Sequence, residues 1–132
     1  MKKNLIILCM LAGVMKMSAL SITSPDGQLV LDVTVDSEGT PVYTLDYKGK
    51  PVIKESRLGL RSDETAFLNG FHIVGTDTAT VDRTWQPVWG EYSEIRDHFR
   101  ELAVRLAAEN PRRDMTVRFR LFDDGLGFRY EL

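Results

Sequence analysis

A chain of 132 residues is long enough for one ordinary domain or for part of a larger one. Its formal net charge of −2 argues against binding to polyanions, so nucleic acid is not an expected partner. Its single cysteine leaves no pair for a disulfide, and a core of apolar side chains must therefore hold the fold together.

The first twenty residues have the pattern of a secretory signal peptide. Two lysines precede an apolar run over residues 5–14, and small residues follow that run. The run is about half as long as the roughly 20 residues that a membrane-spanning helix needs. We therefore predict a signal peptide at residues 1–20 and a mature domain at residues 21–132 that is exported to the periplasm, with no membrane contact after cleavage. Cleavage would also remove Cys9, and with it any cysteine nucleophile or thiolate metal ligand.

The first elements expected in the mature chain are the two strands of a hairpin. Apolar and polar residues alternate over residues 29–35, which predicts a half-buried strand. The polar segment Asp36–Thr40 interrupts this pattern, and alternation resumes over residues 43–47. A short loop that carries a glycine between two such runs is typical of a hairpin.

Short strands are predicted along most of the remaining chain. The extended candidates are residues 51–56, 57–60, 71–76, 79–85, 115–121 and 128–132, with a polar loop at residues 61–70 and a turn at Asp123-Asp124-Gly125. Strands at this short and regular spacing favour an all-β fold, an antiparallel β-sandwich.

One segment, residues 91–109, fits two secondary structures. Its apolar residues recur at steps of three and four, and Asn110-Pro111 supplies a stop, so pattern and propensity favour a helix. From Glu101 onward apolar and polar residues also alternate, so a strand fits the second half equally well. Periodicity alone leaves the choice open.

Four motifs occur in an order that resembles the N-terminal domain of glycoside hydrolase family 97. They are SPDGQLVLDV, YTLDYKGKPVIKESRLGL, TWQPVWGEYSEIRDHFREL and VRFRLFDDGLGFRYEL, and they span essentially the whole mature chain. The resemblance implies an antiparallel β-sandwich of the galactose-mutarotase-like super-sandwich type, incomplete at its C-terminal end. It also implies strands at residues 94–109, an override of local propensity by tertiary context.

The same resemblance implies a function that this chain supports without doing the chemistry itself. Family members are exported, calcium-dependent, exo-acting enzymes, either inverting α-glucosidases or retaining α-galactosidases. Their catalytic carboxylates and most calcium ligands lie in a (β/α)₈ barrel. We expect the chain to brace that barrel and to shape the oligosaccharide pocket of an α-glucosidase, with no catalytic or metal-binding residue of its own. Calcium is expected in the full-length family member. The alternative is a stand-alone carbohydrate-binding module without hydrolase activity, and a third reading is a structural remnant with no ligand.

The segment WQPVWGE, residues 85–91, supplies the candidate sugar-binding residues. In an extended chain Trp85 and Trp89 share one face, about 13 Å apart at roughly 3.3 Å per residue. An indole can either fill a core or stack on a sugar ring. Pro87 cannot donate to a strand ladder and suits an edge or a bend. We predict that Trp85 is buried and that Trp89 and Glu91 lie at a surface that meets the sugar.

The other polar clusters have simpler interpretations. Acids between Glu91 and Glu101 are interleaved with arginines, which is typical of a solvated face and fixes no catalytic pair. Asp123-Asp124-Gly125 is predicted to be a turn, because a calcium loop needs several spaced oxygen ligands. His72 and His98 have no second histidine at metal-binding spacing, so we predict structural roles for both.

Overall fold

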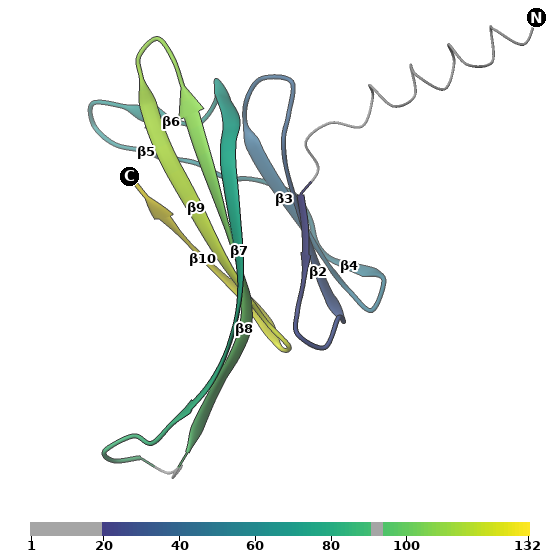
Figure 1. The fold of residues 1–132 in the computed structure, drawn as a ribbon. Coiled ribbons are helices and arrows are strands. Elements are labelled where there is room, and N and C mark those ends of the chain that lie inside the picture. The colour runs from purple at the N-terminus through teal and green to yellow at the C-terminus, as the bar shows by residue number, and fades with distance from the viewer. Residues whose placement is uncertain (1–19, 91–93) are drawn as a thin grey trace, which may run out of the picture.

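The computed structural model describes residues 20–90 and 94–132, and it folds into β-strands in two layers (Figure 1). The strands are β1 (Leu20–Thr23), β2 (Leu29–Val35), β3 (Pro41–Tyr47), β4 (Lys50–Arg57), β5 (Leu60–Arg61), β6 (Ala66–Phe67), β7 (Phe71–Trp85), β8 (Ile95–Ala108), β9 (Arg113–Phe122) and β10 (Gly125–Glu131). One sheet has the order β1-β2-β3-β4, the other β10-β9-β8-β7, and β5 pairs with β6. Every pairing is antiparallel, which confirms the predicted all-β sandwich.

The predicted signal peptide falls almost entirely on residues 1–19, which lie outside the described part of the chain. Within residues 20–90 and 94–132, no helix has the length and apolar character needed to cross a membrane.

The hairpin predicted near the start of the mature chain forms as β2 and β3. Leu31 pairs with Leu45 and Val33 with Tyr43, so the apolar rows of the two strands lie on the same face. Leu31 and Val33 are fully buried there, whereas Asp32 on the other face is only half-buried. Alternation in the sequence therefore predicted both the strands and their buried face.

The segment that fits two secondary structures forms strand β8. The helix favoured by its pattern is wrong, and the strand implied by the family resemblance is confirmed. β8 lies between β7 and β9 and pairs with both, so its backbone groups are satisfied by two neighbours. Leu102, Val104 and Leu106 enter the core on one face, and Ala103 and Ala107 are buried on the other. Pairing on two sides and burial on two faces outweigh the local preference for a helix.

Strand β7 is longer than the sequence indicated. Two short strands were expected at residues 71–76 and 79–85, but a single strand of 15 residues runs from Phe71 to Trp85. Its register with β8 shifts between Ile73 and Gly75, so a bulge absorbs the irregularity without ending the strand. The loop predicted at residues 61–70 also contains the short strand β6.

The core lies between the two sheets and is built from the inward rows of both. It consists of Ile22, Leu29, Leu31, Val33, Leu45, Leu58, Phe71, Leu102, Val104, Leu106, Ala108, Met115, Val117, Phe119 and Leu121. Phe119 of β9 reaches across to Tyr43 of β3, with ring centroids 6.2 Å apart. The two layers are thus held by direct contact between aromatic and aliphatic side chains.

One end of the β7–β8 hairpin extends beyond the sandwich (Figure 1). β7 pairs with β8 as far as Ile95, whereas β9 pairs with β8 only from Phe99 onward. Residues 82–90 and 94–98, which we call the β7–β8 arm, therefore include a ribbon of only two strands. This arm carries residues 85–90 of the segment that was predicted to meet a sugar.

Candidate functional site

The β7–β8 arm displays both tryptophans of the chain. Trp85 is 46% exposed, so the prediction that it is buried is wrong. The reason is that the arm is only two strands wide, and no second layer of the described structure covers this face. Its indole N–H donates to Asp97 Oδ2 at 3.2 Å, so its polar group is satisfied without burial. Trp89 is 88% exposed and Val88 is 98% exposed, which places an apolar surface at the end of the arm.

The predicted contact between sugar and the residues Trp89 and Glu91 stays a prediction. Trp89 lies at a surface that a ligand can reach. Glu91 lies outside the described residues.

Ion pairs join the two strands of the arm on both of its faces. Arg96 donates twice to the carboxylate of Asp82, with distances of 2.9 Å and 2.8 Å. On the opposite face Arg83 Nε lies 3.3 Å from Asp97 Oδ2. Such solvent-exposed pairs contribute little to stability, so their main effect here is to fix side-chain positions.

A shallow hollow of about 420 Å³ opens beside Trp85 and is lined by Arg83, Trp85 and Asp97. It combines an aromatic ring, a guanidinium and a carboxylate on one face of the arm. A sugar ring can place its C–H groups against an indole while its hydroxyls bind polar groups at the rim. The arm therefore has the chemistry of a weak carbohydrate contact.

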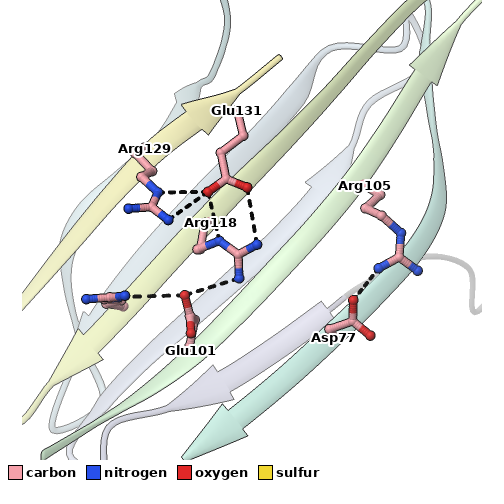
Figure 2. A network of polar contacts seen from close by, with 7 residues as sticks. Asp77, Glu101, Arg105, Arg118, Arg129 and Glu131 are labelled. Carbon is pink, nitrogen blue, oxygen red and sulfur yellow. Dashed lines mark hydrogen bonds and ion pairs between the residues drawn. The ribbon is translucent and has the colours of Figure 1, made fainter. Parts of the chain in front are cut away.

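A second cluster of charges covers the outer face of the sheet that contains β8, β9 and β10 (Figure 2). Arg118 of β9 binds Glu131 at 3.0 Å and Glu101 at 3.3 Å. Arg129 adds a contact to Glu131 at 2.8 Å, and Arg120 lies 3.6 Å from Glu101. The Glu101 side chain is only 14% exposed, so the prediction of a solvated face is wrong at this position. The two arginines of β9 cover it.

Three described carboxylates, those of Asp26, Asp82 and Glu131, are unsuited to act as the general acid of a glycosidase. Hydrogen bonds from Arg118 and Arg129 lower the pKa of Glu131 below its ordinary value, and Arg96 does the same to the pKa of Asp82. The hydroxyl of Ser24 likewise lowers the pKa of Asp26. A general acid needs a raised pKa so that it still holds its proton near neutral pH. Asp26, Asp82 and Glu131 are ionised there and cannot protonate a leaving group.

The Glu131 cluster makes stability depend on pH in one direction. Because the pKa of Glu131 is lower in the folded protein, its ionised form stabilises the fold above the ordinary value of about 4.5. This contribution is lost as the pH falls through the lowered pKa. We expect Glu131→Gln to reduce the free energy of unfolding at pH 7 and to have a smaller effect at pH 3, as measured by urea unfolding at each pH.

The matched control is Glu55→Gln, since Glu55 is an exposed residue of β4 with no ion pair among the described side chains. At pH 7 it should cost less stability than Glu131→Gln, because no arginine binds Glu55. An equal pH dependence for both variants would contradict the role of the arginines around Glu131.

The described residues supply no candidate metal centre. Within residues 20–90 and 94–132, no three His, Cys, Asp or Glu side chains gather in the manner of metal ligands. The turn predicted at Asp123-Asp124-Gly125 connects β9 to β10, and Asp123 Oδ1 accepts a hydrogen bond from the backbone N–H of Asp26 at 2.9 Å. His72 is exposed on β7 and His98 is half-buried on β8. The expectation that this chain has no calcium ligand of its own stays a prediction.

Comparison with known proteins identifies the family. Residues 22–132 match the family model described as glycosyl-hydrolase 97 N-terminal. This chain belongs to glycoside hydrolase family 97. A family-97 enzyme from Pseudoalteromonas sp. strain K8 in complex with acarbose is similar to it, with 34% identity over 86% of this chain and a TM-score of 0.80. A family-97 enzyme from the same strain in complex with panose is 35% identical over 86%, with a TM-score of 0.79.

A β-arabinopyranosidase shares the fold as well, with 27% identity over 86% of this chain and a TM-score of 0.77. This family-97 domain spans 17% of the length of the two Pseudoalteromonas enzymes and 18% of the β-arabinopyranosidase. The sandwich is therefore a minor part of much larger glycoside hydrolases. Since one sandwich fold occurs in enzymes with different sugars, the fold of the domain does not by itself set the sugar.

One residue of this family-97 domain was not singled out from the sequence. Arg100 of β8 has the same parity as Leu102, Val104 and Leu106, so it lies on the inward face of its strand. Its Nη1 donates to Thr23 Oγ1 of β1 at 2.8 Å. An arginine in phase with a buried apolar row is the sequence feature that could have revealed it.

Proposed function

We propose that this chain is the non-catalytic N-terminal β-sandwich of an exported, exo-acting α-glucosidase. In that role it braces the catalytic (β/α)₈ barrel and shapes the entrance of the oligosaccharide pocket. The observation that carries the proposal is the β7–β8 arm, which extends beyond the sandwich and exposes Trp85, Val88 and Trp89. Large exposed apolar side chains that gather in one place are typical of an interaction surface.

The choice of an α-glucosidase is supported by two solved complexes from one strain, the second of them of a Glu-to-Gln variant. The Pseudoalteromonas enzymes hold acarbose and panose, which are both α-linked oligosaccharides. The acid, the base and the calcium ligands would come from the barrel. Export to the periplasm is supported by the signal-peptide pattern of residues 1–20.

The catalytic part of the proposal is tested by assay of this chain alone. We expect no hydrolysis of aryl α-glucosides or aryl α-galactosides, with calcium present, because the catalytic carboxylates would come from the barrel and not from this chain. Turnover that Glu91→Gln abolishes would contradict this and assign a catalytic carboxylate to the sandwich. Genomic sequence after codon 132 provides an independent test, since an intact stop codon with no neighbouring barrel would count against a bracing role.

A stand-alone carbohydrate-binding module is the second candidate, and the exposed Trp89 favours it. Both tryptophans of the chain lie in the arm, so intrinsic fluorescence reports on this surface without background from the core. Under our proposal, titration with maltooligosaccharides up to millimolar concentration leaves the fluorescence of the isolated chain unchanged. A saturable change that Trp89→Ala abolishes, with Trp85→Ala as the matched variant, would establish the binding module instead.

A further inference from the structure

A cleft of about 450 Å³ opens between the free edges of the two sheets. β1 is the last strand of one sheet and β7 is the last strand of the other. The cleft is lined by residues 21–23, residues 78–80 and Arg100. Side chains of consecutive strand residues point to opposite faces of a sheet. Because the cleft is lined by three consecutive residues of each strand, it runs along the backbone edges of β1 and β7 and not over one face of either sheet. Backbone donors and acceptors along these edges are therefore accessible from the cleft.

The edge of β7 carries a bulge between Ile73 and Gly75 but continues as a regular strand from Thr76 to Trp85. β7 has 15 residues and, among the described strands, pairs only with β8. Edge strands are commonly protected by lysine, proline or a covering segment. β7 contains neither lysine nor proline, and residues 76–80, which alternate threonine with other residues, are exposed. Threonine favours an extended backbone, so residues 76–80 have the conformation needed to pair with an additional strand.

Arg100 adds an unmatched positive charge to the same cleft. Its Nε is buried and has no hydrogen-bond acceptor in the described structure. No described carboxylate lies within ion-pair distance of it, whereas Arg96 and Arg105 of the same strand bind Asp82 and Asp77. A partly buried charge without a counter-charge is unfavourable, and a carboxylate that reached the guanidinium would relieve this.

We propose that this cleft binds an extended acidic segment of polypeptide. The backbone of the segment pairs with the free edge of β7 at Thr78–Thr80, and one of its carboxylates binds Arg100. Arg100 pairs with Thr80 in the β7–β8 register, so the residue opposite Thr80 on the added strand shares the face of Arg100. The two positions would lie roughly 9–10 Å apart, which is two strand spacings. Arginine and glutamate side chains together span this gap, so glutamate fits better than aspartate. Backbone pairing provides the affinity and the carboxylate provides the specificity.

The test uses two blocked nine-residue peptides of alternating threonine and valine, one with a central glutamate and one with a central glutamine. Amide hydrogen exchange of the chain is followed by NMR during titration. We expect the glutamate peptide to slow exchange of amides along residues 76–82. The glutamine peptide should bind about tenfold more weakly, because it lacks the charge-assisted hydrogen bond to Arg100.

In the Arg100→Gln variant the two peptides should bind with equal affinity. Both should still slow amide hydrogen exchange along β7, because backbone pairing does not need the guanidinium. Arg105→Gln is the matched control, since Arg105 lies on the same strand but binds Asp77, and it should preserve the preference for glutamate. Equal affinity of both peptides for the unaltered chain would overturn the proposal, as would slowed exchange along β10 instead of β7. Slowed exchange along β7 that rises with protein concentration without peptide would also overturn it, in favour of pairing between two copies of the chain.

Discussion

Replacing Phe119 with alanine is expected to lower the free energy of unfolding by about 3–5 kcal/mol, the usual cost of truncating a buried phenylalanine. Phe119 is 0% exposed and lies at the centre of the core. The centroid of its ring lies 6.2 Å from that of Tyr43 in the opposite sheet and 5.8 Å from that of Phe128 in the neighbouring strand. Because the sandwich has no disulfide, a cavity here weakens the main connection between the layers.

The loss is best measured by urea unfolding followed by far-ultraviolet circular dichroism. Tryptophan fluorescence would be a poor probe of the core, since Trp85 and Trp89 are exposed on the arm. The matched control is Phe128→Ala in the same aromatic cluster. Phe128 is 42% exposed, so its truncation should cost only about 1 kcal/mol, less than burial of a whole side chain provides. Equal losses for the two variants would show that Phe119 does not hold the layers together.

The sequence predicts an element of this fold well where a strand is buried on one face only. In β2 and β9 the buried inward residues are apolar and most of the outward ones are polar, so a period of two is visible along the chain. β8 is different because the outward residues Ala103 and Ala107 are buried as well. When apolar residues occupy both faces of a strand, they are separated by three and four positions as well as by two, so the same sequence also shows the periodicity of a helix. What decides for a strand is its pairing with β7 and β9, which comes from residues distant in sequence.

The candidate site was harder to predict for the same reason. Trp85 was expected to be buried because of its residue type, but burial depends on whether a second layer covers the strand. The Glu101–Arg118 contact depends on the register of β8 and β9, and the Glu131–Arg118 contact depends on the register of β9 and β10. Spacing along the chain does not reveal such registers. In contrast, four motifs in order along the chain, one of them containing WQPVWGE, were sufficient to indicate the family.

The arm and the cleft give the sandwich two distinct contact surfaces. The arm offers exposed indoles beside paired charges, which suits a polar but partly apolar partner such as a sugar or a neighbouring domain. The cleft offers free backbone and an unmatched arginine, which suits an extended peptide. Both surfaces include residues of the β7–β8 hairpin, and the cleft also includes residues of β1, so a change that displaces β7 is expected to affect both surfaces.

Gly39→Ala is expected to lower the free energy of unfolding by about 2–4 kcal/mol, because it disturbs the contact between the β2–β3 turn and the start of β7. Gly39 has a φ of +78°, and a Cβ atom there would lie 2.6 Å from the backbone nitrogen of Phe71. That nitrogen donates to Gly39 O at 2.9 Å, and Gly70 N donates to Glu38 O at 3.0 Å. The substitution must therefore strain the turn and push these hydrogen bonds apart.

Gly49→Ala separates the two causes of this loss, which are the positive φ angle and the clash of the added Cβ atom with the start of β7. Gly49 has a similar φ of +81°, but a Cβ atom there would meet nothing within 4 Å. It should cost only the backbone term of about 1 kcal/mol. Urea unfolding gives both values, and amide exchange at residues 70–71 should accelerate in Gly39→Ala alone. If the two variants lose the same stability, the contact between the β2–β3 turn and β7 does not join the sheets, and the position of the β7–β8 hairpin must be fixed by the core.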